Sequence, residues 1–179
     1  MMAYRLGDPT PKYQGRLTLN PMAHLDPLGA LMLVLFRFGW ARPVIVNPHY
    51  FKDRRRGMML VGLAGPLANV VSAWVFRLTL GFLPSLFPLR VGMVLHQFIL
   101  LNIAINLGLA AFNLIPIPPL DGSKILAGLM PARYGIIFQR LETYGPVLLL
   151  VLLFTGIAGR LMSPIVSFLG RLISIFPTI

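Results

Sequence analysis

The sequence contains no cysteine and little negative charge: five Asp and Glu stand against sixteen Lys and Arg in 179 residues. The lack of cysteine excludes a disulfide framework and thiolate chemistry. Charged residues make up 12% of the chain, about half the share typical of soluble globular domains, so that class is excluded too. Glu142 is the single Glu, and only three His are present, which leaves few groups for metal binding or acid–base chemistry.

Hydrophobic residues are abundant instead. They make up 56% of the chain, and the mean hydropathy of +0.77 predicts an integral membrane protein. The net charge of +11 could indicate nucleic-acid binding, but nine of the sixteen basic residues lie within residues 1–57, in the loops before the longest apolar run. A positive-inside bias explains this distribution. We therefore expect a lipid bilayer as partner and no nucleic acid.

The apolar runs predict an all-α polytopic membrane protein with about three transmembrane helices. The predicted spans are residues 58–83, 92–115 and 145–162. Residues 28–36 form an apolar run that is too short to cross a bilayer, so we expect a re-entrant or interfacial segment there. The whole chain, residues 1–179, is then a single membrane-embedded domain.

The topology of the loops follows from their basic residues. Residues 1–57 are expected to form a loop region on the cytoplasmic side, and residues 37–57 and 118–143 carry the basic residues that assign this side. Within the loop region, residues 16–19 and 44–46 have the character of short strands. We expect them to pair into a small sheet at the membrane surface, whose free edge could hold an extended peptide, although chance alternation in two loops explains the pattern equally well.

Two predicted spans carry patterned small or polar residues. In the first, Ala64, Ala68 and Ser72 recur every four residues and predict close approach of another helix. Asn69 follows Gly65-Pro66 there and is a candidate partner for the carbonyl that proline leaves free. In the second, three asparagines share one helical face: Asn102, Asn106 and Asn113. That face is expected to point into the protein, either for bonding between helices or as part of a site.

Residues 113–122 combine three prolines with a carboxylate directly after the second span. The prolines, Pro116, Pro118 and Pro119, must end the helix because proline lacks the N–H that a helix needs. Asp121 is then expected on non-helical backbone near the membrane face, where an ionisable residue is a functional candidate. In the alternative interpretation it belongs to an ordinary turn and caps a helix that starts near Ser123.

The first residues have the pattern of a helix end. Arg5 is a basic residue where the negative end of the helix dipole is expected. Gly7 is suited to a left-handed C-terminal cap, and Pro9 prevents the helix from continuing. A helix of six residues does not stand alone. We therefore expect the helix to begin upstream of Met1.

The motif from Asn113 through Pro116, Pro118 and Asp121 to Gly122 resembles the Asn-Pro-Asp-Gly motif of the site-2 protease family of intramembrane zinc metallopeptidases. Further segments resemble the compact bacterial and archaeal branch of that family, in the same order. These are residues 4–8, 15–21, 24–27, 47–48 and 64–69. The resemblance therefore covers nearly the whole chain.

The resemblance implies a zinc ion held by two His of an HExxH helix and by the Asp of this motif, with the Glu of HExxH as general base. Asp121 matches the third ligand. Residues expected to line the site or bind substrate are Asn113, Asn69, Pro118 and His24.

HExxH is absent from the 179 residues, whose only His are His24, His49 and His96. The resemblance places that motif on the helix whose end matches residues 2–8, with its second His just upstream of Met1. It implies a protease that cleaves membrane proteins or peptides in a bacterial or archaeal membrane, and this chain is expected to be inactive alone. The alternative is a non-catalytic membrane protein of the same architecture that binds substrates or partner helices.

Overall fold

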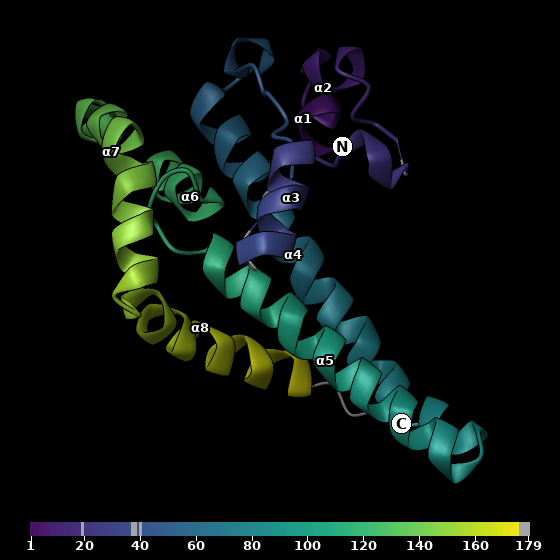
Figure 1. The fold of residues 1–179 in the computed structure, drawn as a ribbon. Helices are drawn as coiled ribbons and strands as arrows, with labels where there is room; N and C mark the ends of the chain where they lie inside the picture. Colours follow the sequence, from purple (N-terminus) through teal and green to yellow (C-terminus); the bar gives the residue numbers. More distant parts are fainter. Residues whose placement is uncertain (19, 37–38, 40, 176–179) are drawn as a thin grey trace. The chain divides into compact units, whose positions relative to one another are not determined.

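The structure, a computed structural model, describes residues 1–18, 20–36, 39 and 41–175. It forms two compact units, Met1–Met58 and Met59–Ile179. The described residues contain eight α-helices (Figure 1): α1 (Met2–Arg5), α2 (Thr10–Tyr13), α3 (Pro27–Phe36), α4 (Arg54–Leu80), α5 (Leu89–Asn113), α6 (Asp121–Leu129), α7 (Gly135–Phe154) and α8 (Ile157–Ser174). Single 3-10 turns also occur: η1 (Pro21–Ala23), η2 (Pro48–Tyr50), η3 (Leu83–Leu86) and η4 (Ala132–Tyr134).

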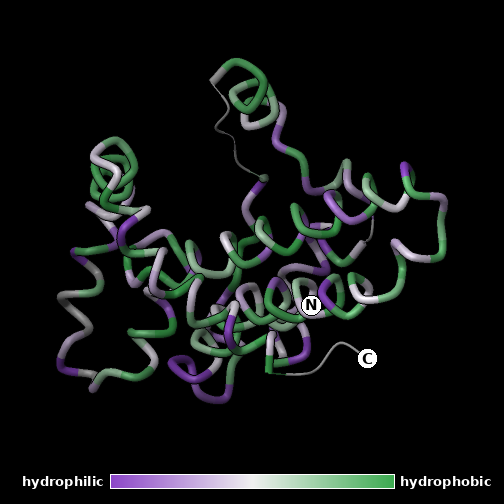
Figure 2. The backbone as a smooth tube through the Cα atoms, turned by 90° about the horizontal axis from the view of Figure 1, so that it is seen from below, coloured by the Kyte–Doolittle hydropathy of each residue, from purple (hydrophilic) through white to green (hydrophobic). Residues whose placement is uncertain are grey.

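The predicted class, an all-α polytopic membrane protein, is confirmed. Three helices, α4, α5 and α8, are long and apolar enough to cross a membrane. Hydrophobic residues predominate along the helices, and the most hydrophilic stretches are short (Figure 2). The predicted spans 58–83 and 92–115 coincide with α4 and α5 to within a few residues, and the short run 28–36 is helix α3. Whether α3 enters the membrane stays a prediction.

The predicted small sheet is wrong. Residues 17–18 form a bend, and residues 44–46 have no regular secondary structure; neither segment pairs as a strand, and Leu19 lies outside the described residues. Within this described part, the one β-contact is the isolated antiparallel bridge between Leu25 and Ala41. A side chain takes the place of the partner strand: Gln14 donates from Nε2 to the Ile45 carbonyl (3.3 Å) and accepts from the Ile45 N–H at Oε1 (3.2 Å). The sheet edge proposed for substrate is therefore not formed.

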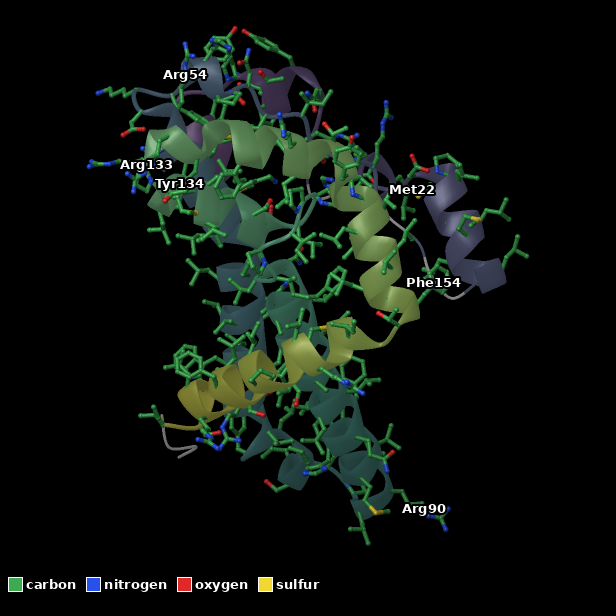
Figure 3. All side chains as sticks on the ribbon, turned by 90° about the vertical axis from the view of Figure 1, so that its left-hand side faces the viewer. Met22, Arg54, Arg90, Arg133, Tyr134 and Phe154 are labelled. Carbon is green, nitrogen blue, oxygen red and sulfur yellow. The ribbon has the colours of Figure 1, made fainter. Side chains whose placement is uncertain are left out.

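The predicted third span, 145–162, is interrupted by the junction of α7 and α8. Gly156 adopts a left-handed conformation with φ of +73°, which suits the glycine that ends many helices because it has no Cβ. The N–H of Thr155 bonds to the Val151 carbonyl (3.0 Å) and closes the last turn of α7. Phe154 lies at this bend (Figure 3). Beyond this junction, helix α8 continues through Pro164 and has the length and composition to cross a membrane.

The second unit has a core where α4, α5 and α8 meet. Its buried members are Ala73, Leu107, Ala110, Leu169 and Ile173. The two alanines are completely buried, because small side chains let helices approach closely. The predicted small-residue stripe of Ala64, Ala68 and Ser72 is not part of this core. Ala68 is exposed, and Ser72 donates from Oγ to the Ala68 carbonyl (2.9 Å).

The first unit is organised around a buried carboxylate. Asp8 is completely buried; its Oδ1 accepts the Thr10 N–H (2.9 Å) and its Oδ2 accepts the Asn47 N–H (2.8 Å). Burial by itself raises the pKa of Asp8, but the bonds from Thr10 and Asn47 stabilise the anion and hold the pKa below its ordinary value. One side chain thus ties the chain after α1 to the segment before η2, which lies 39 residues later in the sequence.

We expect Asp8→Ala to destabilise the first unit by about 1–3 kcal/mol, because the N–H groups of Thr10 and Asn47 lose their acceptor. The pKa of Asp8 is lowered by folding, so its contribution is present above the unfolded-state pKa and is lost as the pH falls through the lower folded pKa. Hydrogen exchange of residues 1–58 in detergent checks both effects. Asp53→Asn is the control, since that half-exposed carboxylate keeps an oxygen for the N–H of Arg55. Equal protection of Asp8→Ala and wild type would contradict the assignment.

Candidate functional site

Asp121 follows a tight turn at the end of α5. The Ile117 N–H bonds to the Ile115 carbonyl (2.8 Å), and the Leu120 N–H bonds to the Ile117 carbonyl (2.9 Å). The turn contains a cis bond between Pro118 and Pro119. Its apolar side chains Ile115 and Leu120 are buried. The turn is therefore held by hydrogen bonds within its own backbone and by the buried side chains of Ile115 and Leu120. These contacts fix the position at which α6 begins.

The conformation of Asp121 differs from both interpretations of the sequence. Asp121 is the first residue of α6, so it does not lie on non-helical backbone, and the N-cap is Leu120. A carboxylate in the first helical turn is favourable because it faces the positive end of the helix dipole. The end of α5 at Asn113 confirms the prediction that the prolines terminate this helix.

Helix α4 approaches the start of α6 through two glycines. A Cβ at Gly62 would lie 2.9 Å from the backbone carbonyl oxygen of Asp121 and 3.1 Å from Cβ of Lys124. A Cβ at Gly65 would lie 3.0 Å from Oδ2 of Asp121. Two α4 positions without side chains, three residues apart, therefore leave the space in which the start of α6 and the Asp121 carboxylate lie.

Two further glycines allow the turn itself to be close-packed. A Cβ at Gly122 would overlap the carbonyls of Leu114 and Ile115, and a Cβ at Gly145 would overlap the carbonyl of Pro118. Gly145 belongs to α7. Pro118 is buried at this contact, so it supports the turn through its backbone and lies under α7.

The carboxylate of Asp121 is partly accessible, and among the described residues it forms an ion pair with Lys124. Lys124, one helical turn later, donates from Nζ to Oδ1 of Asp121 at 2.8 Å, and the two side chains are 36% and 26% exposed respectively. Oδ2 is the oxygen that faces Gly65. The pattern of residues did not reveal the contacts that Lys124, Gly62 and Gly65 make with Asp121. The spacing of three residues between Asp121 and Lys124 was the available signal for the ion pair.

The asparagines of α5 bond within their own helix. Nδ2 of Asn102, Asn106 and Asn113 donates to the carbonyl four residues earlier, at 2.9, 2.8 and 3.0 Å. No bond from these amides to another helix occurs in the described part of the chain. The side-chain oxygens stay available, so a role of Asn113 in a site remains a prediction.

The other predicted site residues lie apart from Asp121 in the sequence. Asn69 is half-buried on α4, one turn beyond Gly65, and its side chain makes no hydrogen bond to any described residue. His24 belongs to the first unit, where its Nε2 contacts the Thr18 carbonyl (2.9 Å). Its ring is thereby engaged by its own loop, and its proposed contact with substrate stays a prediction.

A metal site cannot be assembled from the described residues alone, because they bring no three His, Cys, Asp or Glu side chains together. They offer one carboxylate, Asp121, in the conformation described above. A zinc site needs three or four such ligands.

Comparison with known proteins supplies the family. Residues 89–156 match the profile described as Peptidase family M50. A Bacillus subtilis protein, "Putative zinc metalloprotease YwhC", is 40% identical over 174 residues, which cover 93% of this chain and 77% of that protein. The chain belongs to peptidase family M50. The resemblance to site-2 proteases is thus confirmed, and the Asn113–Asp121 turn lies inside the matched profile.

Two further M50 relatives with the same kind of name come from an archaeon and a mycobacterium. MJ0611 of Methanocaldococcus jannaschii is 37% identical over 102 residues, covering 55% of this chain and 49% of that protein. Rip2 of Mycolicibacterium smegmatis is 30% identical over 166 residues, covering 88% of this chain and 61% of that protein. The chain therefore spans about half to three quarters of the length of these relatives. No solved structure matches the chain significantly.

We expect Gly62→Ala to destabilise the second unit by about 1–3 kcal/mol, because the added methyl group forces the backbone at Asp121 to move. Gly65→Ala should change stability less, since its methyl group meets a carboxylate oxygen that can rotate. Gly108→Ala is the control: a Cβ there meets open space on α5, and the helix gains up to about 1 kcal/mol. Unfolding in detergent measures all three, and equal stability of Gly62→Ala and Gly108→Ala would contradict the close approach.

Proposed function

We propose that this chain forms the Asp-bearing part of an intramembrane zinc metalloprotease, in which Asp121 is the third zinc ligand. Membership of family M50 and the names of the relatives support a zinc protease. The observation that carries the proposal is the carboxylate of Asp121: it is partly exposed, and its Oδ2 faces Gly65 of α4, which has no side chain. A carboxylate held by packed backbone on one side and open on the other can bind a metal without a large rearrangement.

The complete zinc set needs residues beyond these 179. The two His and the Glu of HExxH are absent from the sequence, so the residues of this chain fit a single ligand and no full zinc site. We derive no catalytic step through the metal. This chain contributes the position of Asp121. It also contributes the ammonium group of Lys124, which forms an ion pair with the Asp121 carboxylate.

Substrates of such an enzyme are membrane proteins or membrane-proximal peptides in the bilayer. The three helices with the length and composition of membrane spans support this class of substrate. The second candidate function is a non-catalytic membrane protein that binds substrates or partner helices. Reading the in-frame codons upstream of Met1 separates the two: an apolar segment ending in HExxH supports the protease, and a nearby stop codon supports the non-catalytic protein.

Zinc content tests the ligand set directly. We expect purified residues 1–179 to hold far less than stoichiometric zinc, since one carboxylate cannot replace a His-His-Asp set. A version extended by an HExxH helix should hold zinc at a ratio near one, and Asp121→Ala in that version should lose it. Elemental analysis after dialysis measures the ratio. A ratio near one for residues 1–179 alone would overturn the proposed division of ligands.

Cleavage by the extended version tests the role of Asp121. We expect Asp121→Asn to lower cleavage of a transmembrane peptide by at least about 100-fold, because changes around zinc ligands alone already cost about 10- to 100-fold. Glu142→Gln is the matched control, since Glu142 is the other carboxylate of the second unit and is exposed on α7. Protein yield and helical content should be equal in both variants. Cleavage by Asp121→Asn at the wild-type rate would exclude the assignment.

A further inference from the structure

The first unit contains a cavity that the proposed protease function does not use. Its volume is about 390 Å³, within the range of ligand pockets. Its lining residues are Gln14, Arg16, Asp26, Arg42, Pro43 and Ile45. All of them belong to residues 1–58, so the cavity is complete within one compact unit.

Hydrogen bonds to the backbone hold the walls of this cavity. Gln14 bonds to both backbone groups of Ile45. The Arg42 N–H bonds to the His24 carbonyl (2.9 Å), next to the bridge between Leu25 and Ala41. Arg16 donates from Nη1 to the Ala23 carbonyl. The lining is therefore a built arrangement in which three separate segments are tied together.

The cavity carries unused hydrogen-bond donors. Nε of Arg16 is buried, and no described atom accepts from it. The guanidinium of Arg42 makes no ion pair or hydrogen bond within the described part of the chain. Asp26 accepts the Gly29 N–H at Oδ1 (2.9 Å) and forms no ion pair with either arginine among the described residues. Two guanidinium groups against one carboxylate leave one positive charge, which suits an anion with a single charge and several acceptor oxygens.

The cavity adjoins the start of an apolar helix. Asp26, which lines the cavity, directly precedes the first residue of α3. Most large side chains of α3 are exposed, with Leu28 at 57%, Val34 at 80% and Leu35 at 62%. Ten helical residues reach about 15 Å, half the thickness of a bilayer's hydrocarbon core. If α3 enters one leaflet, its N-terminal end and the cavity lie at the level of the lipid headgroups.

We propose that this cavity binds the phosphodiester headgroup of a membrane phospholipid, with Arg16 and Arg42 donating to the phosphate and α3 lying among the acyl chains. The single negative charge of a phosphodiester matches the single excess positive charge of the lining. Inorganic phosphate fits less well, because its second charge meets the carboxylate of Asp26. The remaining oxygen of Asp26 can accept a hydrogen bond from a headgroup hydroxyl or ammonium group.

The test uses residues 1–179 in nanodiscs made from equal parts of phosphatidylcholine, phosphatidylethanolamine and phosphatidylglycerol. After transfer to detergent, native mass spectrometry counts the phospholipids that stay bound. We expect Arg42→Gln to weaken retention by about tenfold or more, as expected for the loss of one hydrogen bond to a charged group. Arg42 is the first choice because its side chain supports nothing else in the described structure. Arg16→Gln, which also loses the bond to Ala23, should give the same direction of change.

Lys12→Gln is the matched control, because Lys12 is an exposed cation of the same unit that contacts the Tyr4 ring and does not line the cavity. It should retain lipid as the wild type does. Retention by Arg42→Gln at the wild-type level would overturn the proposal. Complete displacement of the lipid by inorganic phosphate at equal concentration would overturn it too, since the cavity would then be a site for free phosphate. Neither result bears on zinc binding by Asp121.

Discussion

The close approach of α4 to the start of α6 is the contact on which the geometry of the candidate site depends. Gly62 faces the backbone of Asp121, and Gly65 faces its carboxylate. Two helices can come this near only where the residues of one of them at the contact are very small, as these two glycines are. The buried turn before α6 also restricts the position of Asp121, because a Cβ at Gly122 would overlap the carbonyls of Leu114 and Ile115. The position of Asp121 is therefore set by backbone packing, and Lys124 provides the one charged partner seen for it.

The chain satisfies many of its polar groups locally, as expected for a membrane protein. The side-chain amides of the α5 asparagines donate hydrogen bonds to backbone carbonyls of the same helix. An amide without a partner in hydrocarbon would cost several kcal/mol, so these bonds lower the cost of amide side chains on a helix that is long and apolar enough to cross a membrane. In the first unit, side chains satisfy backbone groups that a strand would otherwise pair with. Gln14 bonds to the N–H and carbonyl of Ile45, and Asp8 accepts the N–H groups of Thr10 and Asn47.

The two units therefore present different chemistry. The second unit has an apolar core of alanines, leucines and isoleucine between α4, α5 and α8, and it holds the family's Asp motif. The first unit has nine Lys and Arg against three Asp and is built by polar contacts between loops. The same excess positive charge is the basis for expecting this unit at the cytoplasmic surface of a membrane, which stays a prediction.

The sequence by itself determined the class and the family, and it singled out Asp121 as the candidate site residue. Long apolar runs identify α4 and α5 because about twenty such residues are needed to cross a bilayer, and the prolines after Asn113 end α5 because they lack an N–H. Tertiary structure decided what depends on residues far apart in the chain. Whether residues 44–46 pair as a strand depends on Gln14, thirty-one residues from Ile45 in the sequence. The break between α7 and α8 at Gly156 could not be predicted from the apolar run around it, because composition does not show that a glycine adopts a left-handed backbone conformation. The setting of Asp121 likewise depends on Gly62 and Gly65, whose role appears only when α4 packs against α6.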